Sequence, residues 1–149
     1  MKRALVTGSA VRTGRAIALR LARDGWHVCI HGKPGNLADA EDTARSCRDV
    51  GGGASVHPAD ISSLQGCQDL TDSIDLPSLD LLVHNVGIYV TGTLMDTSPE
   101  TWDKIQRTNL DAPFHLNRML VPRMPPGSSI VSLGYVGLGK LAGSTRTAA

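Results

Sequence analysis

The sequence predicts an α/β fold, in which a doubly wound parallel sheet carries helices on both faces. Short apolar runs alternate along the chain with segments whose apolar residues recur every three or four positions, and this alternation is typical of such a sheet. The 149 residues are about one domain. Because 41% of them are hydrophobic and only 19% charged, with a formal charge of +1, we expect a globular protein and no nucleic-acid partner.

The first part of the chain reads strand, helix, strand, helix, strand. Residues 4–7 form a short apolar run, and the apolar residues that follow keep helical spacing until Gly25, which is typical of a helix C-terminus. Residues 26–30 return to a strand pattern. Helical spacing resumes over 37–47 and gives way, after three consecutive glycines, to a strand at 54–57.

The pattern continues in the second part. A weaker helix is expected at 62–74, and the run 79–84 is apolar at both odd and even positions, as in a strand covered on both faces. Ser98 is a favourable N-cap, and Pro99 suits the first helical position. A last strand is expected at 129–133. One helical stripe of the intervening long helix contains Trp102, Ile105, Asn109, Ala112 and Leu116.

A glycine-bounded turn follows the first strand directly and precedes the first helix. Gly8 allows a tight turn, Gly14 allows the helix to approach the strand, and the free N–H groups of a helix N-terminus suit a pyrophosphate. The alternative is a turn without a ligand, but the strand before it and the helix after it favour nucleotide binding. We expect cofactor contacts from Gly8, Ser9, Arg12, Thr13 and Gly14.

The turn TGSAVRTG resembles the TGxxxGxG motif of short-chain dehydrogenases/reductases, in the TGxxxRxG form of pteridine reductases. The segments Ala-Asp-Ile at 59–61 and LVHNVG at 82–87 extend the resemblance, although His84 and Val86 depart from the family's LVNNAG. The resemblance implies a Rossmann-like sheet in the order 3-2-1-4-5, spanning residues 1–134 and about three-fifths of a family member. Residues 135–149 are expected to form an irregular, truncated tail. The resemblance also implies adenosine contacts by Asp60, Ile61, Asn85 and Gly87.

The cofactor expected from these residues is NADP(H) rather than NAD(H). The planar guanidinium of Arg12 suits a 2′-phosphate, although an exposed arginine without a ligand is the simpler alternative. The second strand ends Ile-His-Gly-Lys, without the acidic residue that would hold the ribose hydroxyls of NAD. We expect His31 and Lys33 to add attraction for the phosphate.

The catalytic half of the family pattern is incomplete in this sequence. Asn109 resembles the family asparagine that anchors a water in the proton relay; a core amide and a surface residue are the alternatives. Pro113 lacks the N–H that would bond the Asn109 carbonyl, so we expect a kink there. Tyr135 stands at the position of the family's substrate-binding serine. No YxxxK, the family's general acid and its lysine, occurs anywhere in the sequence.

No metal, membrane or disulfide function is expected. His27, Cys29 and His31 alternate along one strand and share a face, but no fourth ligand is signalled, so ordinary strand residues are the favoured interpretation. The three cysteines lack CxxC spacing and are interpreted as reduced thiols. Without a signal-peptide pattern or an apolar run of 18 residues, we expect a cytoplasmic protein.

The resemblance implies the cofactor-binding part of an NADPH-dependent oxidoreductase that reduces a small-molecule carbonyl or pteridine-like C=N substrate and is inactive by itself. A non-catalytic nucleotide-binding or interaction module is the alternative, and a degenerate fragment is a third. The last strand would form a sheet edge that exposes Ile130, Val131 and Leu133, so we expect self-association. Homo-oligomerisation through the long helix is a further expectation from the resemblance.

Overall fold

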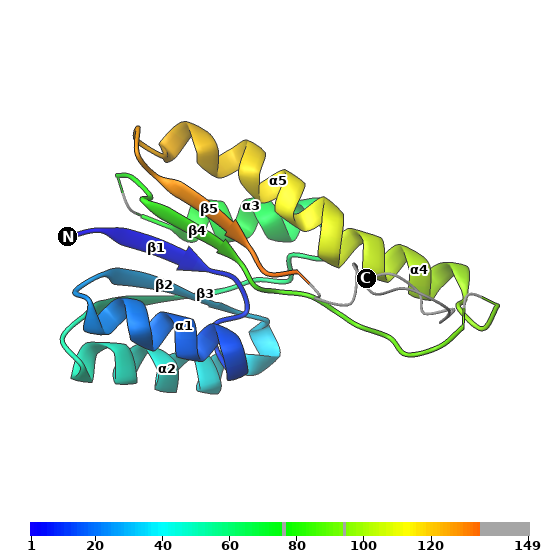
Figure 1. The fold of residues 1–149 in the computed structure, drawn as a ribbon, viewed down its shortest axis with the longest axis horizontal. Helices are drawn as coiled ribbons and strands as arrows, with labels where there is room; N and C mark the ends of the chain where they lie inside the picture. Colours follow the sequence, from blue (N-terminus) through cyan, green and yellow to red (C-terminus); the bar gives the residue numbers. More distant parts are fainter. Residues whose placement is uncertain (76, 94, 135–149) are drawn as a thin grey trace.

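The computed structural model describes residues 1–75, 77–93 and 95–134. Its centre is a five-stranded sheet with the order β3-β2-β1-β4-β5, all neighbours being parallel (Figure 1). This confirms the predicted fold class and strand order. Residues 135–149, with the expected tail and Tyr135, lie outside the described residues. The strands are β1 (Arg3–Val6), β2 (His27–Gly32), β3 (Gly53–Pro58), β4 (Leu81–His84) and β5 (Ser129–Ser132).

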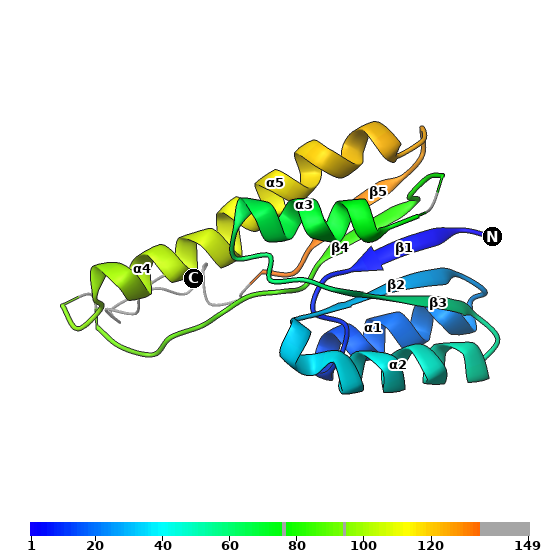
Figure 2. The ribbon, with the colours of Figure 1, turned by 180° about the vertical axis from the view of Figure 1, so that it is seen from behind.

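Helices cover both faces of the sheet, as Figures 1 and 2 show from opposite sides. One face carries α1 (Arg12–Arg23) and α2 (Leu37–Asp49), and the other carries α3 (Leu64–Ser73) and the long helix. The long helix consists of α4 (Pro99–Gln106), the π-helical η2 (Arg107–Asp111) and α5 (Ala112–Leu120). Two short 3-10 turns, η1 (Pro34–Asn36) and η3 (Val121–Arg123), complete the described elements.

The two faces of the sheet hold separate hydrophobic cores. Leu5 and Cys29 belong to the cluster beneath α3 and α5, whereas Val6 and Ile30, their next neighbours in the strands, belong to the cluster beneath α1 and α2. This division follows from the alternation of side chains along a strand. Burial raises the pKa of the Cys29 thiol to about 11, so it is protonated at neutral pH.

The long helix is interrupted where the sequence places Pro113. Instead of a simple kink, the chain forms the π-helical segment η2, in which the Ala112 N–H bonds to the carbonyl of Arg107, five residues back. A proline cannot donate the regular bond, and a π segment shifts the pairing by one residue. The expected stripe is correct for Ile105 and Leu116, which are buried, but Trp102 is 43% exposed and not part of it.

The carboxyl-terminal strand β5 forms an edge of the sheet in the described part of the chain. Ile130, Val131 and Leu133 are 42%, 47% and 44% exposed, as predicted for an uncovered edge. No helix among the described residues is both long and apolar enough to cross a membrane.

Candidate functional site

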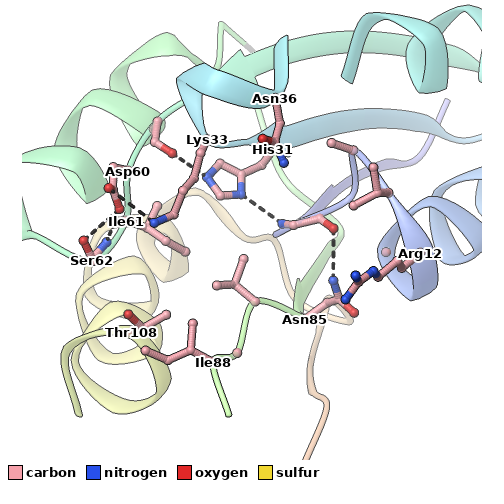
Figure 3. A pocket seen from close by; sticks show the side chains of 18 of the residues that line it. Arg12, His31, Lys33, Asn36, Asp60, Ile61, Ser62, Asn85, Ile88 and Thr108 are labelled. Atoms are coloured by element: carbon pink, nitrogen blue, oxygen red, sulfur yellow. Dashed lines mark hydrogen bonds and ion pairs between the residues drawn. The ribbon is translucent and has the colours of Figure 1, made fainter. Parts of the chain in front are cut away.

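A cleft of about 350 Å³ opens at the carboxyl ends of β1, β2 and β4. In open parallel sheets, ligands bind at the carboxyl ends of the strands, at the point where the chain switches from one side of the first strand to the other. Here that point lies between β1 and β4. Four stretches of chain meet there: the turn after β1 (8 and 10–14), the end of β2 (31–33 and 36), the segment after β3 (59–62) and the segment after β4 (85–88), together with Thr108 (Figure 3).

The turn after β1 has the backbone that the sequence predicted. Gly8 has φ +65°, in the left-handed region that favours glycine. A methyl group on Gly14 would strike the Gly8 carbonyl oxygen and come within 2.7 Å of Asn85 Nδ2. Gly14 therefore lets α1 begin directly against the turn, and the first residues of α1, Arg12 to Gly14, line the cleft.

Asn85 fastens the end of β4 to this turn. Its Nδ2 donates to the carbonyls of Thr7, at 2.9 Å, and Gly8, at 3.2 Å. In return the Thr7 hydroxyl accepts the N–H groups of Asn85, at 2.9 Å, and Val86, at 3.1 Å. Asn85 was expected as an adenosine contact, whereas the role of Thr7 was missed, although its place at the end of an apolar strand was a usable signal.

Arg12 adopts a conformation that is uncommon for a residue with a side chain. Its φ is +51°, and it is the single non-glycine residue with a positive φ among those the structure describes. Arg12 is exposed and lines the cleft. A left-handed conformation costs about 1–2 kcal/mol in a residue with a Cβ atom, and such outliers cluster at ligand sites.

The end of β2 supplies a second positive group to the cleft. Lys33 Nζ lies 3.5 Å from Asp60 Oδ2, and both side chains are more than half exposed (Figure 3). A hydrogen bond from the Ser62 hydroxyl, at 2.8 Å, is the main cause that lowers the pKa of Asp60, and Lys33 contributes further. Gly32, the last residue of β2, also lines the cleft, and a Cβ atom there would lie 3.1 Å from Ala10 Cβ.

His31 lies in the wall of the cleft but without the charge expected of it. The residue is 2% exposed. Burial lowers its pKa to about 4, so the ring is neutral at physiological pH. A neutral ring brings no positive charge to a phosphate, so the lowered pKa gives no support to the charge role expected of His31, although the residue lines the cleft.

Two other expected site residues, Ser9 and Asn109, form hydrogen bonds to the protein backbone. Ser9 is completely buried; its hydroxyl donates to the Val6 carbonyl at 2.7 Å, so it faces the interior rather than the cleft. Asn109 binds the backbone of Ile88 twice: Oδ1 accepts its N–H at 2.8 Å, and Nδ2 donates to its carbonyl at 2.9 Å. Asn109 thus fixes the chain after β4, next to Gly87.

Two histidines outside the cleft, His27 and His57, belong to a polar chain beside the edge strand β3. His27 Nε2 lies 3.0 Å from Ser55 Oγ, and Ser55 Oγ lies 2.7 Å from His57 Nε2. His57 Nδ1 reaches Ser73 Oγ at 2.9 Å. Within the described ranges no three His, Cys, Asp or Glu side chains are grouped as metal ligands.

The family of the chain follows from comparison with known proteins. A family model described as short chain dehydrogenase matches residues 2–136, and the chain belongs to this short-chain dehydrogenase/reductase family. It is 33% identical over 135 residues to the short-chain dehydrogenase/reductase eriH of Hericium erinaceus, covering 85% of this chain and 54% of that protein. It is 35% identical over 127 residues to a D-beta-hydroxybutyrate dehydrogenase of Cupriavidus necator, covering 83% and 48%.

Solved structures agree with this assignment. The angucycline C-6 ketoreductase LanV with bound NADP superposes with a TM-score of 0.89 at 29% identity, covering 97% of this chain and 59% of that chain. The chain thus spans about half the length of the two curated relatives and about three-fifths of LanV.

Proposed function

We propose that this chain is the NADP(H)-binding part of a short-chain oxidoreductase. The observation that carries the proposal is the cleft, whose lining includes two cationic side chains, Arg12 and Lys33, together with Gly32. Two cations beside a residue without a carboxylate favour the 2′-phosphate of NADP(H) over the free ribose hydroxyls of NAD(H). The NADP bound to LanV, which shares the fold, supports the same choice.

The remaining residues of the cleft have corresponding places in this proposal. The turn at Gly8 and the N–H groups of Thr13 and Gly14 receive the pyrophosphate. Asp60 and Ile61 border the adenine. The backbone at Asn85 and Gly87 lies along the adenosine ribose.

The substrate class that we propose is a carbonyl compound, with a pteridine-like C=N compound as the second candidate. The similarity to a ketoreductase and a hydroxybutyrate dehydrogenase supports the first, and the TGxxxRxG turn supports the second. Bound NADPH supplies a hydride to the substrate carbon. Asn109 holds the Ile88 backbone beside the cleft. The proton for the substrate oxygen or nitrogen needs a donor that this sequence, lacking YxxxK, does not provide in the family manner.

Because a positioned general acid contributes about 10²–10⁴-fold in rate, we expect this chain alone to bind NADPH without efficient turnover. The missing YxxxK also favours a second candidate function, a nucleotide-binding module without chemistry. Joining the chain to a YxxxK-bearing C-terminal segment and measuring NADPH oxidation with a carbonyl and pteridine panel separates the two. Appearance of substrate-dependent oxidation supports the oxidoreductase, and continued inactivity supports the module.

The cofactor assignment is tested by titrating NADPH and NADH into the chain and its variants. We expect tighter binding of NADPH. Since hydrogen bonds to charged groups contribute about 1.5–3 kcal/mol, Arg12→Ala and Lys33→Ala should each reduce the preference by about 10–100-fold. Arg20→Ala is the matched control, because Arg20 is an exposed arginine at the far end of α1. Equal or tighter binding of NADH by the unaltered chain would overturn the assignment.

A further inference from the structure

The imidazole of His31 bridges two parts of the cleft wall that no regular sheet bond connects. Its Nδ1 lies 2.9 Å from the Gly8 nitrogen, in the turn after β1, and its Nε2 lies 3.2 Å from the carbonyl oxygen of Ala59, just after β3 (Figure 3). The backbone reinforces the first contact: the Ser9 N–H donates to the His31 carbonyl at 2.8 Å, and the His31 N–H donates to Ser9 Oγ at 3.0 Å.

The partners of His31 fix its protonation. The Gly8 N–H is a donor, so Nδ1 must accept and carry no proton. The Ala59 carbonyl is an acceptor, so Nε2 must carry the proton and donate. The neutral Nε2–H tautomer is therefore the form that makes both bonds. A proton on Nδ1 would place two donors face to face.

The peptide units at Gly8 also set where α1 begins. The Gly8 carbonyl lies so close to Gly14 that a methyl group there would strike it. The same carbonyl accepts from Asn85 Nδ2 at 3.2 Å. A shift of the turn at Gly8 is therefore transmitted to the first turn of α1, whose residues Arg12 to Gly14 line the cleft.

We propose that His31 is a positioning residue for nucleotide binding: its neutral ring holds the Gly8 amide against the end of β3 and so fixes the turn that receives the pyrophosphate. This inference rests on the proposed function. The ring itself contacts no phosphate. It acts through Gly8, and acid releases the turn by placing a proton on Nδ1.

The groups around the ring keep it neutral over the physiological range. Burial is the main cause that lowers the pKa of His31, to about 4, and the charges of His57 and Lys33 act in the same direction. The Ala59 carbonyl and the Asp60 carboxylate oppose them. The turn is therefore locked at neutral pH and is released only as the pH approaches 4.

Three substitutions separate the two ring contacts. His31→Asn places an amide oxygen near the position of Nδ1 and preserves an acceptor for Gly8. His31→Gln reaches the position of Nε2 and preserves only the bond to Ala59, and His31→Leu removes both. His27→Asn is the matched control, since His27 lies on the same face of β2 but bonds to Ser55, outside the cleft.

The measurements are made on the full ¹⁵N-labelled chain at neutral pH. We expect the ring nitrogens of His31 to show the Nε2–H tautomer. Because one hydrogen bond contributes about 0.5–1.5 kcal/mol, Gly8 amide exchange and the Kd for NADP⁺ should both rise about 3–10-fold in His31→Leu and His31→Gln. Both should stay near the unaltered values in His31→Asn and His27→Asn. As the pH is lowered from 5 toward 4, the affinity of the unaltered chain should fall relative to that of His31→Asn.

The outcomes distinguish this inference from the function on which it rests. If the unaltered chain fails to bind NADP⁺, the proposed function is wrong, and the proposed role in nucleotide binding is overturned with it. If it binds NADP⁺ while His31→Leu leaves both the affinity and Gly8 exchange unchanged, only the role of His31 is overturned. An Nδ1–H tautomer at neutral pH would overturn it as well.

Discussion

Replacing Gly14 by alanine adds one methyl group at the most crowded glycine of the cleft. The new Cβ would strike the Gly8 carbonyl oxygen and lie 2.8 Å from the Gly8 carbonyl carbon and 2.7 Å from Asn85 Nδ2. The two Gly8 atoms belong to the backbone, and Asn85 Nδ2 is held by its bonds to the carbonyls of Thr7 and Gly8, so the turn or α1 must move. Overpacking of this kind costs about 1–3 kcal/mol. Breaking the Asn85 bond to Gly8 adds about 1 kcal/mol, which the better helix propensity of alanine offsets by about the same amount.

The expected net loss is therefore about 1–3 kcal/mol of unfolding free energy, measured by urea denaturation with and without NADPH. Two control variants separate stability from binding. Gly35→Ala meets nothing within 4 Å and should unfold like the unaltered chain. Gly52→Ala, whose Cβ would lie 2.6 Å from Ala22 Cα, should lose similar stability at the other end of the strands.

Nucleotide binding adds a second readout to the same experiment. NADPH at 100 times its Kd stabilises a binding protein by about 2.7 kcal/mol. We expect that gain in the Gly35 and Gly52 variants and a smaller one in Gly14→Ala, because α1 is displaced from the turn. A Gly14→Ala variant with unaltered stability and an unaltered response to NADPH would refute the reasoning from this contact.

Three further predictions concern Arg12, acid stability and the sheet edge. Arg12→Gly and Arg12→Ala should lose the same preference for NADPH, but only glycine removes the strain of the left-handed conformation, about 1–2 kcal/mol. The greater entropy of glycine in the unfolded chain opposes this gain by about 0.5–1 kcal/mol. Arg12→Gly should therefore be up to about 1 kcal/mol more stable than Arg12→Ala in urea unfolding. In the folded chain, burial lowers the pKa of four histidines, His27, His31, His57 and His84. The unfolded chain therefore binds more protons below pH 6.5, and the free energy of unfolding should fall from there toward pH 4. His31, with a pKa of about 4, contributes about 3 kcal/mol of this loss, and a flat unfolding midpoint from pH 7 to 4.5 would contradict the prediction. Val131→Lys, on the exposed strand β5, should reduce the self-association that concentration-dependent sedimentation measures. Val50→Lys, the same substitution at the exposed end of α2, should leave it unchanged. An unaltered chain that sediments as a monomer would show that the edge does not drive association.

The fold and the outline of the cleft were predictable because they depend on local patterns. The apolar run at 79–84 and the glycines at 8 and 14 each determine the backbone near them, and strand order followed from the family resemblance. The charge of His31 was not predictable, because it depends on burial and on two partners from Gly8 and Ala59, 23 and 28 residues away along the chain. The same holds for Trp102, whose helical spacing matched the buried stripe, whereas the π-helical turn that follows it changes which side of the helix faces the core.

Arg12 shows how the conformation and the proposed ligand explain each other. Its backbone has a left-handed φ of +51°, which a glycine would adopt without strain. An arginine there weakens the fold, and its exposed guanidinium gains no described ion pair that would compensate. A nucleotide phosphate would supply that compensation, because a bidentate guanidinium–phosphate pair is stronger than a neutral hydrogen bond. The strained residue is thus best understood as part of the ligand site, so NADPH should protect the unaltered chain against unfolding more than it protects Arg12→Gly.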